Sequence, residues 1–579
     1  MRRLTWPSRI LLAAAVGFGG SLFTLASGVR TVDAQAAPPA APALVARAPS
    51  PSQPAWDESQ PGYVGSKACE LCHTPEYNQW HRSLHVQMTK PIADARVEGH
   101  FGPGVRLEAY GRSYRMSKEN GHYYVSVSLN GGRPTKYEVD YTLGARRFQG
   151  YLSKLPDGRI YVLPVFWHRL TQRWLDWSEI TPIPKHYTDD IRQIWNVNCV
   201  NCHAVNIAPN YDVASHTYKT TWTEMGVGCE ACHGPGAAHI ALMKQWDAQP
   251  SLKPAYDRGA KNPDLSRILH IFVPQSATSR QVLDACGYCH GNKTNYFIGF
   301  KPGDLMEDYA VPFLISQPMS PNDSQGEFWP DGRPSRFNRP QAVMDSQCFL
   351  KGGATCTSCH VAHGSRWDHS LKVDIDVPGK PGEHSRQSDT LCTQCHKTFT
   401  TPNPAGGAPI AHDFTDAGLS AHTHHPVDSQ GSRCINCHMA DVNWRLLTRR
   451  LDHTFLPPVP EMTAGFGEPN ACTTCHDDKT PEWAGSTMDA WYHDRARREA
   501  SLKVADAMYR AGTGELSALP DVARLAVDRA QPPIIRASAA TFAGRLIWAA
   551  RSGTAGALAA PPGTRGGPTQ TSFGGARAA

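Results

Sequence analysis

The sequence predicts a mainly α-helical fold with extensive irregular loops, a small antiparallel β insertion and a helical C-terminal segment. The 579-residue chain has 46 prolines, 49 glycines and only 19% charged residues, which is typical of short elements joined by loops. Apolar and polar residues alternate over Tyr123–Leu129, and the run Ile160–Trp167 is strand-like, so both predict strands. Residues 482–551 are rich in Ala, Arg and Leu at helical spacing.

One short motif recurs along the central part of the chain. It consists of two cysteines separated by two residues and followed directly by a histidine. Its eight copies, numbered motifs 1 to 8 in chain order, are Cys69/Cys72/His73, Cys199/Cys202/His203, Cys229/Cys232/His233, Cys286/Cys289/His290, Cys356/Cys359/His360, Cys392/Cys395/His396, Cys434/Cys437/His438 and Cys472/Cys475/His476. They contain 16 of the 17 cysteines.

Cys-x-x-Cys-His is the attachment signature of haem c. The two thiols add to the porphyrin vinyl groups as thioethers, and the histidine becomes the proximal ligand of the iron. A single copy would also fit a zinc half-site or a redox-active cysteine pair. Eight copies favour eight covalent haem c groups. We interpret the remaining Cys348 as a small buried apolar residue, with a reactive thiol as the alternative.

Histidines outside the motifs are candidates for the sixth ligand of each iron. The chain has 26 histidines, so 18 remain after the eight motifs are counted. His81 and His85 are four residues apart and would share one face of a helix. We prefer His85 as the ligand, with a surface histidine as the alternative.

The formal net charge of +6 does not predict nucleic-acid binding. Eight haems would add sixteen propionates and bring the formal charge to about −10, starting from +6. The partners that we expect are therefore redox proteins.

The N-terminus predicts export. Arg2 and Arg3 precede an apolar run from Ile10 to Ala26, and Ala34-Gln35-Ala36 fits a cleavage site, which predicts a signal peptide over residues 1–36. We therefore expect a periplasmic or extracellular protein. The alternative is an uncleaved membrane anchor, although the apolar run is shorter than the about 20 residues that usually span a bilayer.

The remaining chain divides by composition. We expect an Ala/Pro-rich linker over 37–60, a haem domain over 61–480 with a β-rich insertion over 101–180, helices over 481–551 and a disordered tail over 552–579. The insertion is interpreted as a cover for haem edges, with a docking surface for a partner as the alternative. Few residues separate motifs 2 and 3 or successive motifs from 5 to 8, so these haems should be near neighbours.

Residues 61–480 resemble the multihaem c-type cytochromes related to the tetrahaem electron carrier of nitrifying bacteria and to hydroxylamine oxidoreductase. The stretches that carry the resemblance are Gly228–Gly236 with His239, Cys356–His363, His422-Thr-His-His425 before motif 7, and Asp452–Phe455 before motif 8. The resemblance implies that histidines outside the motifs are sixth ligands, often to a haem that is not the nearest in sequence. It singles out His239, His363, His425 (or His424) and His453, with His85 next.

Two functions follow from these expectations. The first is electron transfer through mostly bis-histidine haems, from a membrane quinol-linked donor to a terminal reductase or an extracellular acceptor. The second is an oxidoreductase that acts on small nitrogen or sulfur oxyanions, of the nitrite, hydroxylamine or tetrathionate type, at one haem with an open position. No Cys-x-x-Cys-Lys variant is present, whereas relatives that reduce nitrite often use lysine at the catalytic iron. A haem-based sensor is a weaker third alternative.

Overall fold

The structure, a computed structural model, describes residues 61–180, 194–256, 262–315, 327–335, 338–401, 410–444, 448–492 and 495–553. All of them belong to one compact unit, Pro54–Ala579. The predicted signal peptide, the Ala/Pro-rich linker and residues 554–579 of the predicted tail lie outside the described residues.

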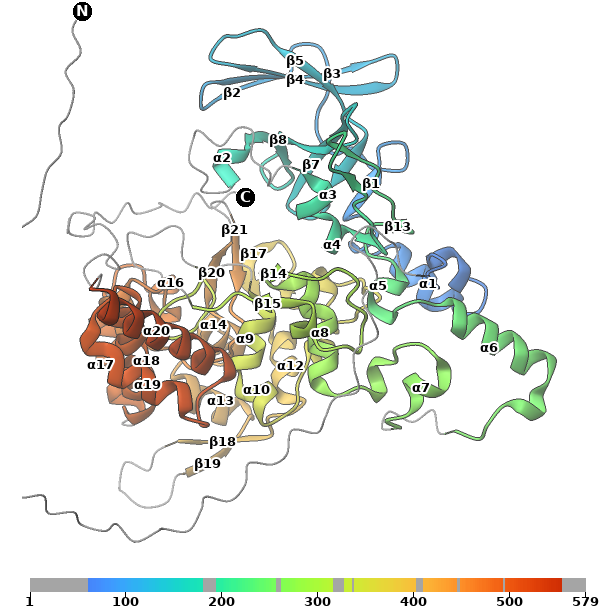
Figure 1. The fold of residues 1–579 in the computed structure, drawn as a ribbon. Coiled ribbons are helices and arrows are strands. Elements are labelled where there is room, and N and C mark those ends of the chain that lie inside the picture. Colours follow the sequence, from blue (N-terminus) through green and yellow to red (C-terminus); the bar gives the residue numbers. More distant parts are fainter. Residues whose placement is uncertain are drawn as a thin grey trace, which may run out of the picture. The chain divides into compact units, whose positions relative to one another are not determined.

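Two antiparallel sheets are formed by residues 89–176 (Figure 1). The five-stranded sheet has the order β1 (Thr89–Pro91), β6 (Tyr141–Leu143), β7 (Phe148–Lys154), β8 (Ile160–His168) and β9 (Arg173–Asp176). The four-stranded sheet has the order β2 (Arg106–Ala109), β3 (Arg112–Glu119), β4 (His122–Leu129) and β5 (Thr135–Glu138).

Strand β8 is buried on both faces, which explains its continuous apolar sequence. Leu163, Val165 and Trp167 point into one core, which is shared with the four-stranded sheet. Ile160 and Val162, at alternate positions, point into a second core with Trp195 and Val200. Because Trp195 and Val200 flank the first cysteine of motif 2, the β region packs directly against a haem-attachment segment.

The prediction of a mainly α-helical fold with a small β insertion is wrong. Of the described residues, 41% are helical and 19% lie in strands, and the β region begins at Thr89 rather than near residue 101. The described residues also form six two-stranded sheets, which pair β10 (Ala204–Val205) with β13 (Glu224–Met225), β11 (Tyr211–Asp212) with β12 (Thr217–Tyr218), β14 (Lys293–Asn295) with β15 (Ala310–Pro312), β16 (Asp376–Val377) with β17 (Lys380–His384), β18 (Thr398–Thr401) with β19 (Ile410–Asp413), and β20 (Asp441–Trp444) with β21 (Thr448–Leu451). Strands of two to five residues are too short to give a periodic signal in the sequence.

Short helices hold the motifs. They are α3 (Trp195–Asn198) and α4 (Val200–His203) for motif 2, α5 (Cys229–His233) for motif 3, α8 (Ser279–His290) for motif 4, α11 (Cys356–Cys359) for motif 5, α12 (Thr390–Thr393) for motif 6, α14 (Cys434–His438) for motif 7 and α16 (Ala471–Cys475) for motif 8. Motif 1 lies between a 3-10 turn, Ser66–Cys69, and α1 (Thr74–His81). One helical turn brings residues three apart onto the same face, so both thiols of a motif can reach one porphyrin.

Seven further helices connect or cover these segments. They are α2 (Trp177–Ile180), α6 (Ala237–Ala248), α7 (Leu265–Leu269), α9 (Arg339–Asp345), α10 (Gln347–Leu350), α13 (Asp416–Thr423) and α15 (Glu461–Phe466). None of the described helices combines the length and the apolar character needed to cross a membrane.

The C-terminal part is helical: α17 (Pro481–Tyr492), α18 (Ala496–Gly512), α19 (Leu519–Val527) and α20 (Pro533–Ser552). The buried side chains of Met508, Val522 and Phe542 form its core. Phe328, which precedes α9 in the chain, is buried in the same core, so these helices dock on the rest of the protein. The backbone N–H of Ile315 also donates to Ser538 Oγ at 3.0 Å.

Candidate haem sites

The sulfur atoms of the motifs are available for attachment, because all 17 cysteines are free thiols. The leftover Cys348 is partly buried, and burial raises the pKa of its thiol. A raised pKa disfavours the reactive thiolate. Cys348 therefore fits the interpretation as an apolar packing residue.

Six of the eight motif histidines face a second histidine ring at nearly the same separation. The ring centroids are 6.3 Å apart for His73 and His239, 6.4 Å for His290 and His85, 6.2 Å for His233 and His363, 6.5 Å for His360 and His453, 6.3 Å for His438 and His422, and 6.1 Å for His476 and His425.

The separation matches two imidazoles on opposite sides of one metal ion. A metal–nitrogen bond of about 2 Å, and a further distance of about 1.1 Å from that nitrogen to the ring centre, place two such rings about 6.3 Å apart. The residues present thus fit a haem iron between each pair.

The other ring nitrogen of several of these histidines is tethered to the backbone. The carbonyl acceptors of Nδ1–H are Phe272 for His233 (2.9 Å), Leu269 for His239 (2.8 Å), His369 for His360 (2.9 Å), Thr423 for His425 (2.5 Å) and Leu451 for His453 (2.9 Å). A carbonyl only accepts, so Nδ1 carries the proton and Nε2 keeps a free lone pair. This arrangement is typical of histidines that bind a metal.

Burial keeps three of the paired rings neutral. It lowers the pKa of His290 and of His453 to about 3 and that of His438 to about 4. A metal binds the neutral imidazole, so these side chains need to lose no proton at neutral pH.

In five of the six pairs the second histidine comes from the segment of another motif, and the exception is His422, which precedes motif 7 and faces His438 of that motif. His239 follows motif 3 but faces His73 of motif 1, and His363 follows motif 5 but faces His233 of motif 3. His85, which follows motif 1, faces His290 of motif 4. Each such pair ties two motifs together, and this accounts for the contact of segments that are far apart in sequence.

All five of the preferred sixth-ligand residues, His85, His239, His363, His425 and His453, are members of these pairs. His424 is not, because its ring stacks on Trp491 at 4.5 Å. The prediction missed His422, which faces His438. The run His422-Thr-His-His425 contained the signal, since a helix end such as that of α13 can direct residues three apart to two neighbouring sites.

His203 of motif 2 and His396 of motif 6 differ from the other motif histidines. Within the part of the chain that the structure describes, neither ring faces a second imidazole. The His203 ring is buried against Thr89, with Nδ1 3.2 Å from Thr89 Oγ1, and burial lowers its pKa to about 4. His396 is exposed.

Thiols of different motifs lie against each other. The contacts join Cys69 to Cys229, Cys202 to Cys289, Cys286 to Cys356 and Cys392 to Cys434. Two further pairs are close enough for the charge of one thiolate to raise the pKa of the other thiol. Cys392 raises the pKa of Cys359, and Cys472 raises that of Cys437. Motifs 5 to 8 are therefore successive neighbours, while motif 1 adjoins motif 3 and motif 4 adjoins motifs 2 and 5.

Two family models match the chain. One, described as cytochrome c554 and c-prime, matches residues 178–234, and the other, a doubled CXXCH motif, matches residues 349–401. Together with the eight motifs they decide the class. The protein is a multihaem c-type cytochrome.

Two known proteins resemble this cytochrome. The C-type polyheme cytochrome OmcC of Geobacter sulfurreducens is 24% identical over 258 residues, which is 40% of this chain and 30% of that protein. The chain thus matches less than a third of the length of that relative. The crystal structure of the outer cell wall cytochrome OcwA superposes with a TM-score of 0.43 at 15% identity and covers 85% of this chain and 99% of that one. The expected resemblance to hydroxylamine oxidoreductase stays a prediction.

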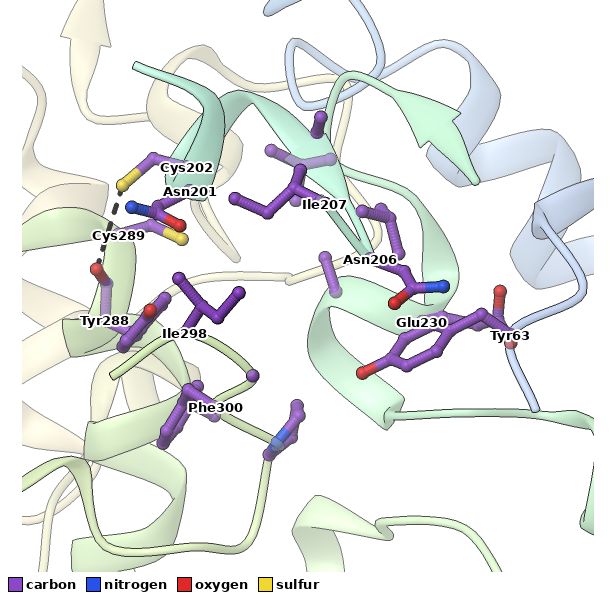
Figure 2. Close-up of a pocket in the computed structure, with 17 residues that line it drawn as sticks. Tyr63, Asn201, Cys202, Asn206, Ile207, Glu230, Tyr288, Cys289, Ile298 and Phe300 are labelled. Carbon is purple, nitrogen blue, oxygen red and sulfur yellow. Dashed lines mark hydrogen bonds between the residues drawn. The ribbon is translucent and has the colours of Figure 1, made fainter. Parts of the chain in front are cut away.

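A pocket of the cytochrome lies among motifs 2, 3 and 4 (Figure 2). Cys202 and Cys289 line it, and Cys202 Sγ lies 3.8 Å from the Tyr288 carbonyl oxygen. Most of the other lining side chains are apolar, including Ile298 and Phe300. Because Cys202 and Cys289 belong to different motifs, this apolar surface fits the edges of two neighbouring porphyrins.

Glu230, inside motif 3 of the cytochrome, is a buried carboxylate with three backbone donors. It accepts from the N–H groups of Val64 (3.0 Å), Gly65 (2.7 Å) and Gly236 (2.7 Å). The segment before motif 1 is thereby fixed on motif 3, where Cys69 meets Cys229. No sequence pattern marks Glu230, since its partners are backbone groups.

Proposed function

We propose that this cytochrome carries eight haem c groups and transports electrons between redox partners outside the cytoplasm. The single observation that carries the proposal is the set of six imidazole pairs at 6.1–6.5 Å. A bound haem supplies reversible one-electron chemistry between the ferric and ferrous states. Where two histidines hold both axial positions, the site has no position for a substrate and serves electron transfer.

The contacts between motifs support transport through a series. Thiol contacts and thiol charges link motif 1 to 3, 3 to 4, and then 4 through 8 in order, while motif 2 adjoins motif 4. The chain holds its attachment sites close together, so that each is next to another along the whole described length. Such closeness is what stepwise electron transfer needs.

The exposed motif cysteines suggest where electrons enter and leave. Cys72 of motif 1, Cys395 of motif 6 and Cys475 of motif 8 are exposed, whereas the other motif cysteines are partly buried. We place the exchange with a quinol-linked donor and with a reductase or extracellular acceptor at these three motifs. Export of the chain is part of the proposal, and the predicted signal peptide over residues 1–36 supports it.

The second candidate function is reduction or oxidation of a small nitrogen or sulfur oxyanion. The observation that favours it is that, among the described residues, His203 and His396 face no second imidazole. An iron held only by such a histidine would offer a position for substrate.

Protein-film voltammetry of the holoprotein separates the two functions. We expect reversible haem signals, and no catalytic current when nitrite, hydroxylamine or tetrathionate is added. A catalytic wave with any of these substrates would contradict the carrier proposal and support the enzyme.

A further inference from the structure

The turn Asp368–Ser370, which follows motif 5, contains two consecutive left-handed residues. His369 has φ 58° and ψ 12°, and Ser370 has φ 54°. They are the one place among the described residues where two non-glycine residues with positive φ follow each other. A side chain makes this backbone conformation costly, and such strain persists only where surrounding contacts hold it. Contacts from outside the turn must therefore keep it in place.

The strained turn holds the histidine of motif 5. The carbonyl of His369 accepts from Nδ1 of His360 at 2.9 Å, and the carbonyl of Ser370 accepts from the N–H of Val361 at 2.7 Å. The carbonyls of both left-handed residues thus point at the end of motif 5. A hydrogen bond at Nδ1 fixes the ring orientation of a metal-binding histidine. The conformation of the turn therefore sets the direction of the His360 ring.

Arg146, in the loop between β6 and β7, holds this turn from outside. Arg146 Nη2 forms an ion pair with Asp368 Oδ2 at 2.5 Å and donates to His369 Nε2 at 3.0 Å. Asp368 Oδ1 in turn accepts from the His369 N–H at 3.1 Å. Only 26% of the Arg146 side chain is accessible, so water screens this contact less than it would a fully exposed ion pair. One guanidinium group thus fixes two side chains of the strained turn.

The loop that carries Arg146 has a fixed backbone. Arg169 Nη1 donates to the carbonyl of Ala145 at 2.5 Å and to that of Arg146 at 3.2 Å. The backbone N–H of Arg169 donates to the carbonyl of Arg147 at 2.9 Å. Because three successive carbonyls of the loop are held by one residue of the β region, Arg146 is a rigid support for the turn.

We propose that Arg146 is a positioning residue for the haem site of motif 5. It holds the turn Asp368–Ser370, and the turn orients the His360 ring. The orientation of that ring determines the angle between the planes of His360 and His453, which is 16°. Hydrogen bonds behind an axial ligand tune the properties of the iron. The β region then does more than cover haem edges, because its loop helps to set the geometry of one haem site.

This inference rests on the proposed function, since it takes His360 and His453 as the two axial ligands of one iron. It holds whether that haem carries electrons or serves catalysis. Electron paramagnetic resonance of the oxidised holoprotein tests it, because the g values of a low-spin haem depend on the angle between its axial imidazole planes. In Arg146→Gln, we expect one low-spin signal to leave its wild-type position while the others stay. Arg146→Lys keeps the charge and a donor for Asp368, and should leave the spectrum closer to that of the wild type.

Replacing both left-handed residues by glycine distinguishes positioning from a simple effect of charge. Glycine adopts positive φ without steric cost, so a turn with His369→Gly and Ser370→Gly no longer needs support. Adding Arg146→Gln to this double variant should therefore leave its g values unchanged. A signal that moves by the same amount in both backgrounds would show that the charge of Arg146 acts directly, and would refute the positioning role.

Arg173→Gln is the matched control, because it removes an ion pair with Glu179 from strand β9 of the same β region. It should leave every signal in place. An Arg146→Gln variant with full haem content and wild-type g values would overturn the proposal. If that variant loses haem, Asp368→Asn removes the same ion pair from the other side and is measured in the same way. Failure of the proposed function is distinguishable, because the wild-type protein itself would then lack low-spin bis-imidazole signals.

Discussion

At the scale of single residues, the recurring feature is an imidazole whose Nδ1 is tied to a carbonyl and whose Nε2 faces another ring. His239 shows how this works, since its ring is held by Leu269 and faces His73 at 6.3 Å. The tether fixes both the tautomer and the direction of the ring before haem is attached. The sequence alone could identify His239 as a candidate ligand but not the motif histidine that it faces, because the pairing depends on how distant motifs fold together.

Replacing His239 by Ala should leave one haem with a single protein ligand. We expect unchanged haem content and conversion of about one eighth of the ferric spins from low spin to high spin, measured by electron paramagnetic resonance. His216→Ala is the matched control, because His216 is exposed and hydrogen-bonds to Tyr211 on a short hairpin. An unaltered spectrum for the His239 variant would assign the ligand elsewhere.

Glu230→Gln tests the link between motifs 1 and 3. The change keeps the shape of the side chain but removes the charge that three backbone N–H groups share, and hydrogen bonds to a charged group are each worth about 1.5–3 kcal/mol. We expect the free energy of unfolding to fall by about 1–3 kcal/mol in guanidinium titrations. Glu108→Gln, on the exposed strand β2, should change it by less than about 0.5 kcal/mol. Equal effects of the two changes would contradict the role of Glu230.

At the scale of elements, the sequence indicated the strongest segments and missed the short ones. The apolar run of β8 and the apolar–polar alternation of β4 could be recognised in the sequence, because these strands are nine and eight residues long. The six two-stranded sheets could not be predicted. Their strands pair through the backbone across haem-attachment loops and are too short to show an alternation of apolar and polar side chains. Except for α8, the helices that contain motif residues are four or five residues long, and the cysteine spacing rather than helical propensity marks them.

The C-terminal helices provide a prediction at this scale. Phe542 of α20 is fully buried in the core that also holds Phe328, so Phe542→Ala should lower the free energy of unfolding by about 3–5 kcal/mol through loss of burial and a cavity. Trp548→Ala, on the exposed face of the same helix with 61% of the residue accessible, should change it by less than about 0.5 kcal/mol. Circular dichroism in denaturant would measure both. Similar losses for the two variants would show that α20 does not dock through this core.

At the scale of the whole molecule, histidines and thiols cross-link motifs that are far apart in the chain. Five of the six described pairs join a motif to a histidine from the segment of another motif, as His85 does for motif 4 and His453 for motif 5. The haems themselves would therefore complete the core, which explains how a chain with 40% hydrophobic residues can hold so many irregular segments. Spacing between motifs predicted that motifs 5 to 8 follow one another, but the contacts of motif 1 with motif 3 and of motif 4 with motifs 2 and 5 required the structure.

The central claim is that paired histidines fill the axial positions of most haems in an electron carrier. Quantitative electron paramagnetic resonance of the fully oxidised holoprotein, with and without nitrite and hydroxylamine, tests it most directly. With eight haems per chain, we predict that at least six contribute low-spin bis-imidazole signals that neither compound alters. More than two equivalents of high-spin iron, or a low-spin majority that changes when nitrite or hydroxylamine is added, would contradict the claim.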